Sequence, residues 1–208
     1  MSEPESDKVD LRSEIPRFRP ATPPPSFGEL VENLRRLQDL AVSVDATDEV
    51  YAQARDRVAE LTELLAPYAA PEGKGPANRS MALPGRGSLL MPPFVVEKFD
   101  EESVVARGVL RRYHLGGGGV AHGGVLPLIF DDNFGNVVYA AKRPISRTAY
   151  LHVNYRKVTP LDVPLIIEGK VDRVDGRKTF ITARLTEEDG TLLADGEGLM
   201  VQLLPGQP

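Results

Sequence analysis

The chain contains no cysteine and no tryptophan, and only three of its 208 residues are histidines. Without cysteine there is neither a disulfide framework nor thiol chemistry, which fits a reducing compartment. The three histidines form no pair at a recognised zinc spacing, so we expect no metal site. The chain also lacks a G-x-S-x-G serine elbow and a phosphate-binding loop ending in Gly-Lys-Ser or Gly-Lys-Thr. Serine-hydrolase and P-loop chemistry are therefore not expected.

Long apolar runs and an excess of positive charge are also missing. No uninterrupted apolar stretch is long enough to cross a bilayer, and the N-terminal MSEPESDKVD lacks the apolar core of a signal peptide. The net charge of −5 gives no electrostatic reason to expect nucleic acid or an anionic membrane as a partner. We expect a folded cytoplasmic protein, because 41% hydrophobic residues suffice for a packed core.

Proline content and helical periodicity divide the N-terminal part of the chain. Residues 1–25 are charged and then rich in proline, which predicts an extended arm. Residues 26–66 show two amphipathic patterns, which predict a helical hairpin with one apolar face. Ser26 and Glu29 fit a capping box at the start of the first helix, and the second should end before Pro67.

The C-terminal part begins after a stretch that suppresses regular structure. Residues 67–93 are rich in proline and glycine and are expected to be a linker, followed by a domain over residues 94–208. In that domain, strand-like alternation surrounds one helix, predicted from about residue 124 to 142. Asp175-Gly176 and Asp189-Gly190 predict tight turns, so the last three strands should form an antiparallel meander. The order of elements predicts an α+β domain with one sheet packed on one central helix.

The predicted helix carries the most informative motif, HGGVLPLIFDDNFG, which runs from His122 to Gly135. Two carboxylates, Asp131 and Asp132, lie in a strongly apolar segment. An ionised carboxylate on the buried side of such a helix requires a partner or a function, whereas one on the other side faces water.

Residues 94–204 resemble the hotdog-fold acyl-CoA thioesterases, specifically the PaaI-like and thioesterase-superfamily-member branch. In that branch HGG opens the central helix, an acid follows nine positions after the histidine, a T-x-x-L-x-V-x-Y strand comes next, and then a hairpin similar to VDRVDGRKTFITARL. The matching residues here are His122, Asp131, Thr148, Leu151, Val153 and Tyr155. The resemblance implies a hotdog fold and hydrolysis of fatty acyl-CoA to free acid and CoA, without metal or redox cofactor.

The resemblance also assigns roles to individual residues. The backbone N–H of Gly123 would bind the thioester oxygen at the helix N-terminus, and Gly124 would keep that approach open. Asp131 would act as a general base on water or attack the carbonyl directly to give an anhydride. His122 would orient the loop or polarise the carbonyl, and Thr148 would position the attacking water. Glycines in this place could also simply turn the chain into the helix.

Two details depart from this pattern. Strict alternation places Thr148 on the opposite face of its strand from Leu151, so the assignment requires a bulge near Ala149. Many relatives also have a polar residue six positions before the histidine, where this chain has Gly116. A second backbone N–H or His114 would then have to supply that contact.

Helix geometry predicts that two chains build the site. Gly123 and Asp131 are eight residues apart, about 12 Å along a helix, too far to reach one thioester carbon. We therefore expect a homodimer or a dimer of dimers in which the two helices run antiparallel, as the family is built. The nearby basic residues, which are candidates for binding the CoA phosphates or for a solvated face, are Arg156, Lys157, Arg177 and Lys178.

Other functions remain open at this point. The main alternative is a non-catalytic hotdog protein that binds acyl-CoA as a regulator or sensor. Residues 27–66 contain nine acidic residues against four arginines, which opposes a DNA-binding role for the helical pair. A hotdog hydratase or dehydratase is a third option, and the acyl carrier could be acyl-carrier protein in place of CoA.

Overall fold

The computed structural model describes residues 20–207. The predicted arm of residues 1–25 therefore lies almost entirely outside the described residues. The helices are α2 (Pro25–Ala41), α3 (Asp48–Leu65) and α4 (Val125–Ala140), with short 3-10 turns η2 (Ala66–Tyr68), η3 (Pro84–Gly87) and η4 (Arg112–His114). The strands are β1 (Phe94–Phe99), β2 (Val104–Val109), β3 (Leu115–Gly117), β4 (Val120–Ala121), β5 (Ser146–Tyr155), β6 (Pro164–Asp175), β7 (Lys178–Glu187) and β8 (Leu192–Gln202).

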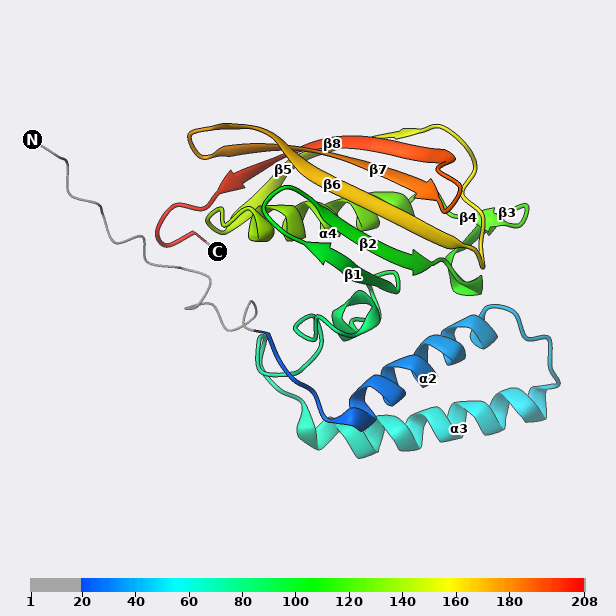
Figure 1. Cartoon of the computed structure of the whole chain (residues 1–208). Helices are drawn as coiled ribbons and strands as arrows, with labels where there is room; N and C mark the ends of the chain where they lie inside the picture. Colours follow the sequence, from blue (N-terminus) through cyan, green and yellow to red (C-terminus); the bar gives the residue numbers. More distant parts are fainter. Residues whose placement is uncertain (1–19, 208) are drawn as a thin grey trace, which may run out of the picture.

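Six strands form one antiparallel sheet in the order β1-β2-β6-β7-β8-β5 (Figure 1). The predicted meander is confirmed, since β6, β7 and β8 are neighbours joined by short turns. In the first turn Asp175 pairs with Lys178, so the two loop residues are Gly176 and Arg177. Within residues 20–207, strand β5 pairs only with β8, which leaves it at the edge of the sheet.

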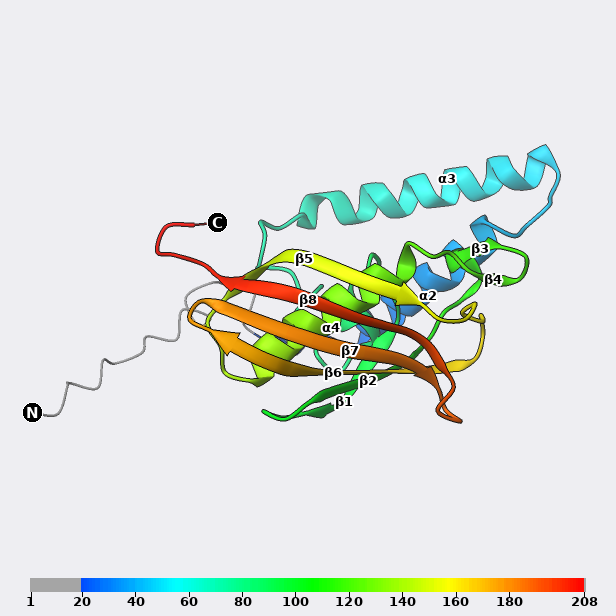
Figure 2. The same cartoon turned by 90° about the horizontal axis from the view of Figure 1, so that it is seen from above.

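Helix α4 packs on one face of this sheet, as the order of elements predicted (Figure 2). Phe130 and Phe134 are fully buried and meet edge to face, with ring centroids 6.2 Å apart. Gly196 and Gly198 on β8 make this approach close, because a Cβ there would lie 2.8 Å from Phe130 and 2.6 Å from Phe134. The sheet and helix thus form one core, and α4 is held at a fixed distance from β8.

The two N-terminal helices are present but differ in how they pack. The expected capping box is wrong, because α2 begins at Pro25 and no side chain caps its first turn. Proline suits the first helical position, where its missing N–H would have no partner. Helix α2 is attached to the domain through Asp39, which accepts hydrogen bonds from the Arg111 side chain and the Tyr113 N–H. Helix α3 lies farther from the sheet than α2 and contributes no buried residue (Figure 1).

Candidate active site

Asp131 lies on the exposed side of α4 and faces the start of β5. The Thr148 hydroxyl donates a hydrogen bond of 2.6 Å to one Asp131 carboxylate oxygen. The same hydroxyl oxygen lies 3.3 Å from the sulfur of Met200. Because a hydroxyl has one hydrogen, the short contact to the carboxylate orients Thr148 and leaves the second Asp131 oxygen open to the cavity.

A β-bulge places Thr148 beside the carboxylate. Thr148 pairs with Met200 and Tyr150 pairs with Leu199, so the register shifts by one residue at Ala149. This is the bulge that the alternation of β5 required, and it turns Thr148 to the face that covers α4. The expected bulge near Ala149 is thus confirmed.

Asp132, the next residue on α4, has a different partner. Its carboxylate forms a two-point ion pair with the Arg86 guanidinium, in which one N–O distance is 2.7 Å. The side chains are 20% and 23% exposed, so the pair is largely shielded from water. The two adjacent carboxylates are therefore unequal: within the described part of the chain, a guanidinium is the partner of Asp132, whereas Asp131 accepts from a neutral hydroxyl.

The loop before α4 leaves one backbone donor unused. The Gly124 N–H donates to His122 Nδ1 at 3.0 Å, which leaves Nε2 as the ring nitrogen that carries hydrogen in the neutral imidazole. The Gly123 carbonyl accepts from the Tyr155 hydroxyl at 2.9 Å. Among the described residues, no acceptor receives the Gly123 N–H. Of the two loop glycines, Gly123 is thus the one with a free donor at the start of a helix.

Gly116 and His114 support this loop from behind. A Cβ at Gly116 would lie 2.6 Å from His122 Cα, so the close approach of the loop excludes a polar side chain there. The His122 N–H donates to the His114 carbonyl at 2.7 Å. The His114 ring is 5% exposed and stacks on Tyr113, and it does not line the cavity beside Gly123. The idea that this ring contacts the substrate is therefore not supported.

Within one chain, the two halves of the candidate site open into different cavities. Asp131 and Thr148 line a cavity of about 480 Å³ between α4, β5 and residues 72–86. Gly123 and Tyr155 line another of about 360 Å³ at the other end of β5. A single chain thus does not bring Gly123 and Asp131 to one point, in agreement with their spacing along the chain.

The four basic residues separate into two pairs. Arg156 and Lys157 line the cavity that contains Gly123. Arg156 is also paired with Asp195 at 2.6 Å, which raises the Arg156 pKa and lowers the Asp195 pKa. Arg177 donates to the Gln202 carbonyl, and Lys178 is in register with Val201, near the start of β5. One chain therefore brings Arg156 and Lys157 to Gly123 but not Arg177 and Lys178.

Residues 20–207 contain no group of three or more histidine, aspartate or glutamate side chains placed to hold a metal ion. In the same part of the chain, no helix combines the length and apolar character needed to span a membrane.

Sequence reasoning missed Arg86. It lies in the segment expected to be a linker, where a Pro-Gly-Arg-Gly run indicates a turn and nothing about the partner of a side chain. Its pairing with Asp132 depends on the fold of residues 46 positions apart, which no local pattern shows.

Comparison with known proteins finds a family model that matches part of the chain. Residues 118–194 match the model of the thioesterase superfamily. The chain is similar to the acyl-coenzyme A thioesterase THEM4 of Mus musculus, with 29% identity over 91 residues, and to that of Xenopus laevis, with 32% over 89 residues. These matches cover 43% and 42% of the chain and 39% of each relative. The chain therefore matches about two fifths of the length of these curated relatives.

Solved structures agree with the sequence matches. A crystal structure of a thioesterase superfamily protein has a TM-score of 0.73 and 24% identity, covering 88% of this chain and 93% of that one, which shows the shared fold. A hypothetical thioesterase from Streptococcus pneumoniae, solved with coenzyme A, has a TM-score of 0.50 and 25% identity over 52% of this chain and 86% of that one. The six-stranded sheet packed on α4 is thus the fold of a solved thioesterase superfamily protein, and residues 118–194 match the model of that superfamily.

Proposed function

We propose that the protein hydrolyses fatty acyl-CoA thioesters to free acid and CoA. The observation that carries this proposal is the pairing of an accessible Asp131 carboxylate with the Thr148 hydroxyl at 2.6 Å, beside a cavity of about 480 Å³. The relatives named as acyl-coenzyme A thioesterases and the relative solved with coenzyme A support the substrate class.

In this reaction Asp131 removes a proton from a water molecule that attacks the thioester carbon, or its oxygen attacks that carbon itself. Thr148 holds the carboxylate in one orientation, so that the open oxygen faces the cavity. The negative charge that develops on the carbonyl oxygen is stabilised by the free Gly123 N–H at the start of α4. The C–S bond then breaks, and CoA leaves as the thiolate and takes a proton. When water is the nucleophile, this step gives the free acid. When Asp131 attacks directly, it gives an anhydride, which a water molecule then hydrolyses to release the acid and restore the Asp131 carboxylate.

The site is composite, with each half supplied by a different protomer. Thr148 and Asp131 lie at the start of the open-edged strand β5, and Tyr155, which binds Gly123, lies at its end. If two β5 edges pair antiparallel about a twofold axis, Thr148 and Asp131 of one protomer approach Gly123 of the other, and two equal sites result. This accounts for a glycine at 123, where in one chain a Cβ would make only an ordinary contact of 3.6 Å.

The same arrangement bears on how the CoA phosphates are held. Arg177 and Lys178 lie at the end of the sheet where β5 begins, and Arg156 and Lys157 follow its other end. Antiparallel pairing of two β5 strands therefore brings the first pair toward the second pair of the other protomer. Lysine and arginine side chains there would offset the charge of the CoA phosphates.

A thiol-release assay over a series of saturated acyl-CoAs tests the proposal. Asp131→Asn should reduce kcat by at least about 10²-fold with little change in acyl-CoA binding, because the variant keeps the shape but loses the base. Asp172→Asn is the matched control, since its side chain is 52% exposed on β6. Asp132 is unsuitable as a control because it is paired with Arg86.

The assay also separates hydrolysis from the alternative of a sensor. A sensor would bind acyl-CoA without releasing thiol, in the wild type as in Asp131→Asn. Equal turnover by the wild type and Asp131→Asn would refute the role of Asp131.

A further inference from the structure

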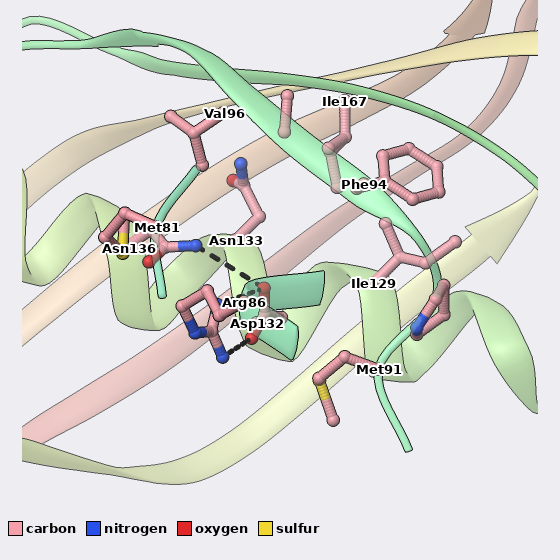
Figure 3. A pocket seen from close by; sticks show the side chains of 12 residues that line it. Met81, Arg86, Met91, Phe94, Val96, Ile129, Asp132, Asn133, Asn136 and Ile167 are labelled. Carbon is pink, nitrogen blue, oxygen red and sulfur yellow. Dashed lines mark hydrogen bonds and ion pairs between the residues drawn. The ribbon is translucent and has the colours of Figure 1, made fainter. Parts of the chain in front are cut away.

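The Arg86–Asp132 ion pair lies between two cavities and lines both of them. On one side is the cavity of about 480 Å³ that contains Asp131 and Thr148. On the other side is a narrow slot of about 20 Å³ between α4, the start of β1 and residues 81–92 (Figure 3). The slot has room for roughly one water molecule. The ion pair is thus the partition between the reacting group and the slot.

Both partners of the pair are held firmly. Arg86 has φ of 53° between Gly85 and Gly87, a left-handed conformation that an arginine adopts only when its surroundings impose it. The buried Arg35 side chain holds the segment around Arg86 by donating to the carbonyls of Pro84, Ser88 and Met91. Asp132 belongs to the helix α4 and accepts a second, longer contact of 3.4 Å from Asn136. An ion pair with two contacts between two fixed elements therefore separates the cavity from the slot.

The slot beyond the ion pair is largely apolar, but the amides of Asn133 and Asn136 also line it, and Asn133 Oδ1 is buried with no hydrogen-bond partner among the described residues. Its lining consists mainly of Met81, Met91, Phe94, Val96, Ile129 and Ile167. Figure 3 shows the two methionines on either side of the Arg86–Asp132 pair. Methionine side chains are unbranched and flexible, so they can fill a slot of this kind and also move aside for an alkyl chain. The ligand class that fits this lining is a run of methylene groups.

We propose that the acyl chain of the substrate lies in the cavity of about 480 Å³ beside Asp131, and that the Arg86–Asp132 pair closes the end of this cavity and so sets an upper limit on the length of the acyl chain. This inference rests on the proposed thioester hydrolysis at Asp131. An alkyl chain does not pass the pair, since that would leave a guanidinium and a carboxylate without partners against methylene groups. Without the pair, the slot becomes a continuation of the cavity.

The test compares kcat/KM for saturated acyl-CoAs from butanoyl to palmitoyl in the full-length protein. The double variant Arg86→Met/Asp132→Asn removes both charges with little change in volume. The ratio of kcat/KM for palmitoyl-CoA to that for octanoyl-CoA should rise by about tenfold or more, as expected for added apolar contacts. The matched control is Arg107→Met, which removes a surface arginine paired with Glu97 and Glu188 on the sheet exterior.

A double variant that folds and is active, but has the wild-type chain-length profile, overturns the proposal. If it does not fold, Arg86→Lys keeps the charge but loses the two-point geometry. It should shift the profile in the same direction, and an unchanged profile again overturns the proposal.

The same variants in an Asp131→Asn background separate this inference from the proposed function. Calorimetric binding of the acyl-CoA series then reports chain-length preference without turnover. If the wild type releases no thiol, the proposed hydrolysis fails. A shift of binding toward longer acyl chains in the variants without the ion pair would still support the proposed limit on chain length. Unchanged binding preference overturns it.

Discussion

At the residue scale, the Thr148 hydroxyl has a single hydrogen, and the structure directs it to Asp131 at 2.6 Å. Thr148→Val keeps the shape of the side chain and removes this donor, so the carboxylate loses its fixed orientation. We predict a fall in kcat of about 10²-fold with a small change in KM, because misplaced catalytic groups affect the chemical step. Steady-state thiol release measures both constants.

Thr148→Ser is the matched control for this prediction. Serine retains the hydroxyl, so turnover should stay close to that of the wild type. If valine and serine give the same kcat, the hydrogen bond to Asp131 has no part in the reaction.

The buried His114 is expected to make the stability of the fold depend on pH. Burial lowers the pKa of His114 to about 4, whereas the Arg111 N–H that binds Nδ1 leaves the neutral ring satisfied there. In the unfolded chain its pKa is about 6.5. The unfolded state therefore takes up a proton first as the pH falls, and stability present above pH 6.5 is lost progressively toward pH 4.

Urea titration at several pH values measures the unfolding free energy of the wild type. Between pH 6.5 and pH 4, His114 should lower this free energy by up to ~1.4 kcal/mol for each unit by which the pH falls. His114→Gln should show a shallower slope between these limits, although it is less stable overall. Equal slopes for His114→Gln and wild type would contradict the prediction.

At the scale of elements, α2 holds the segment that carries Arg86. Arg35 is 1% exposed and donates to the carbonyls of Pro84, Ser88 and Met91. Arg35→Met leaves these carbonyls without a donor, which should lower the unfolding free energy by about 1–3 kcal/mol. Urea denaturation measures the loss.

Arg36→Met is the control for this prediction, because Arg36 is the next residue on α2 and its side chain is 66% exposed. Its surface pair with Glu32 contributes little, so the change should stay within about 0.5 kcal/mol. Similar losses in both variants would show that the segment is not held by Arg35.

At the scale of the whole molecule, the position of β5 at the sheet edge leads to a test of the composite site. Asp131→Asn and Gly123→Pro, which removes the backbone donor, should each be nearly inactive alone. When they are mixed after unfolding and refolding, a mixed dimer contains one site with both intact groups. The mixture should recover about a quarter of wild-type activity.

Light scattering should show a dimer or tetramer for each sample. Each variant refolded alone is the control, because neither then forms a site with both groups intact. If the refolded mixture recovers nothing while both variants assemble, the two groups act within one chain and the composite site is wrong.

The sequence by itself determined the sheet, the central helix and the bulge. Alternation and helical periodicity follow from which residues must face a core, and these signals are local. The bulge at Ala149 could be anticipated because Thr148 and Leu151 have opposite parity in a regular strand, while the family pattern requires both on the face toward α4. The nine-residue step from His122 to Asp131 was equally readable, since both lie on one continuous segment.

Only the tertiary structure decided what the side chains of distant segments do. The Pro-Gly-rich residues 67–93 read as a linker, yet they supply Arg86 and the wall of a cavity. In the sequence Arg35 is one of the four arginines of the helical pair, but in the structure it is buried against loop carbonyls 49 to 56 residues away. Such contacts depend on how separate elements pack. An ion pair or a buried hydrogen-bond donor between distant segments produces no periodic pattern in the sequence.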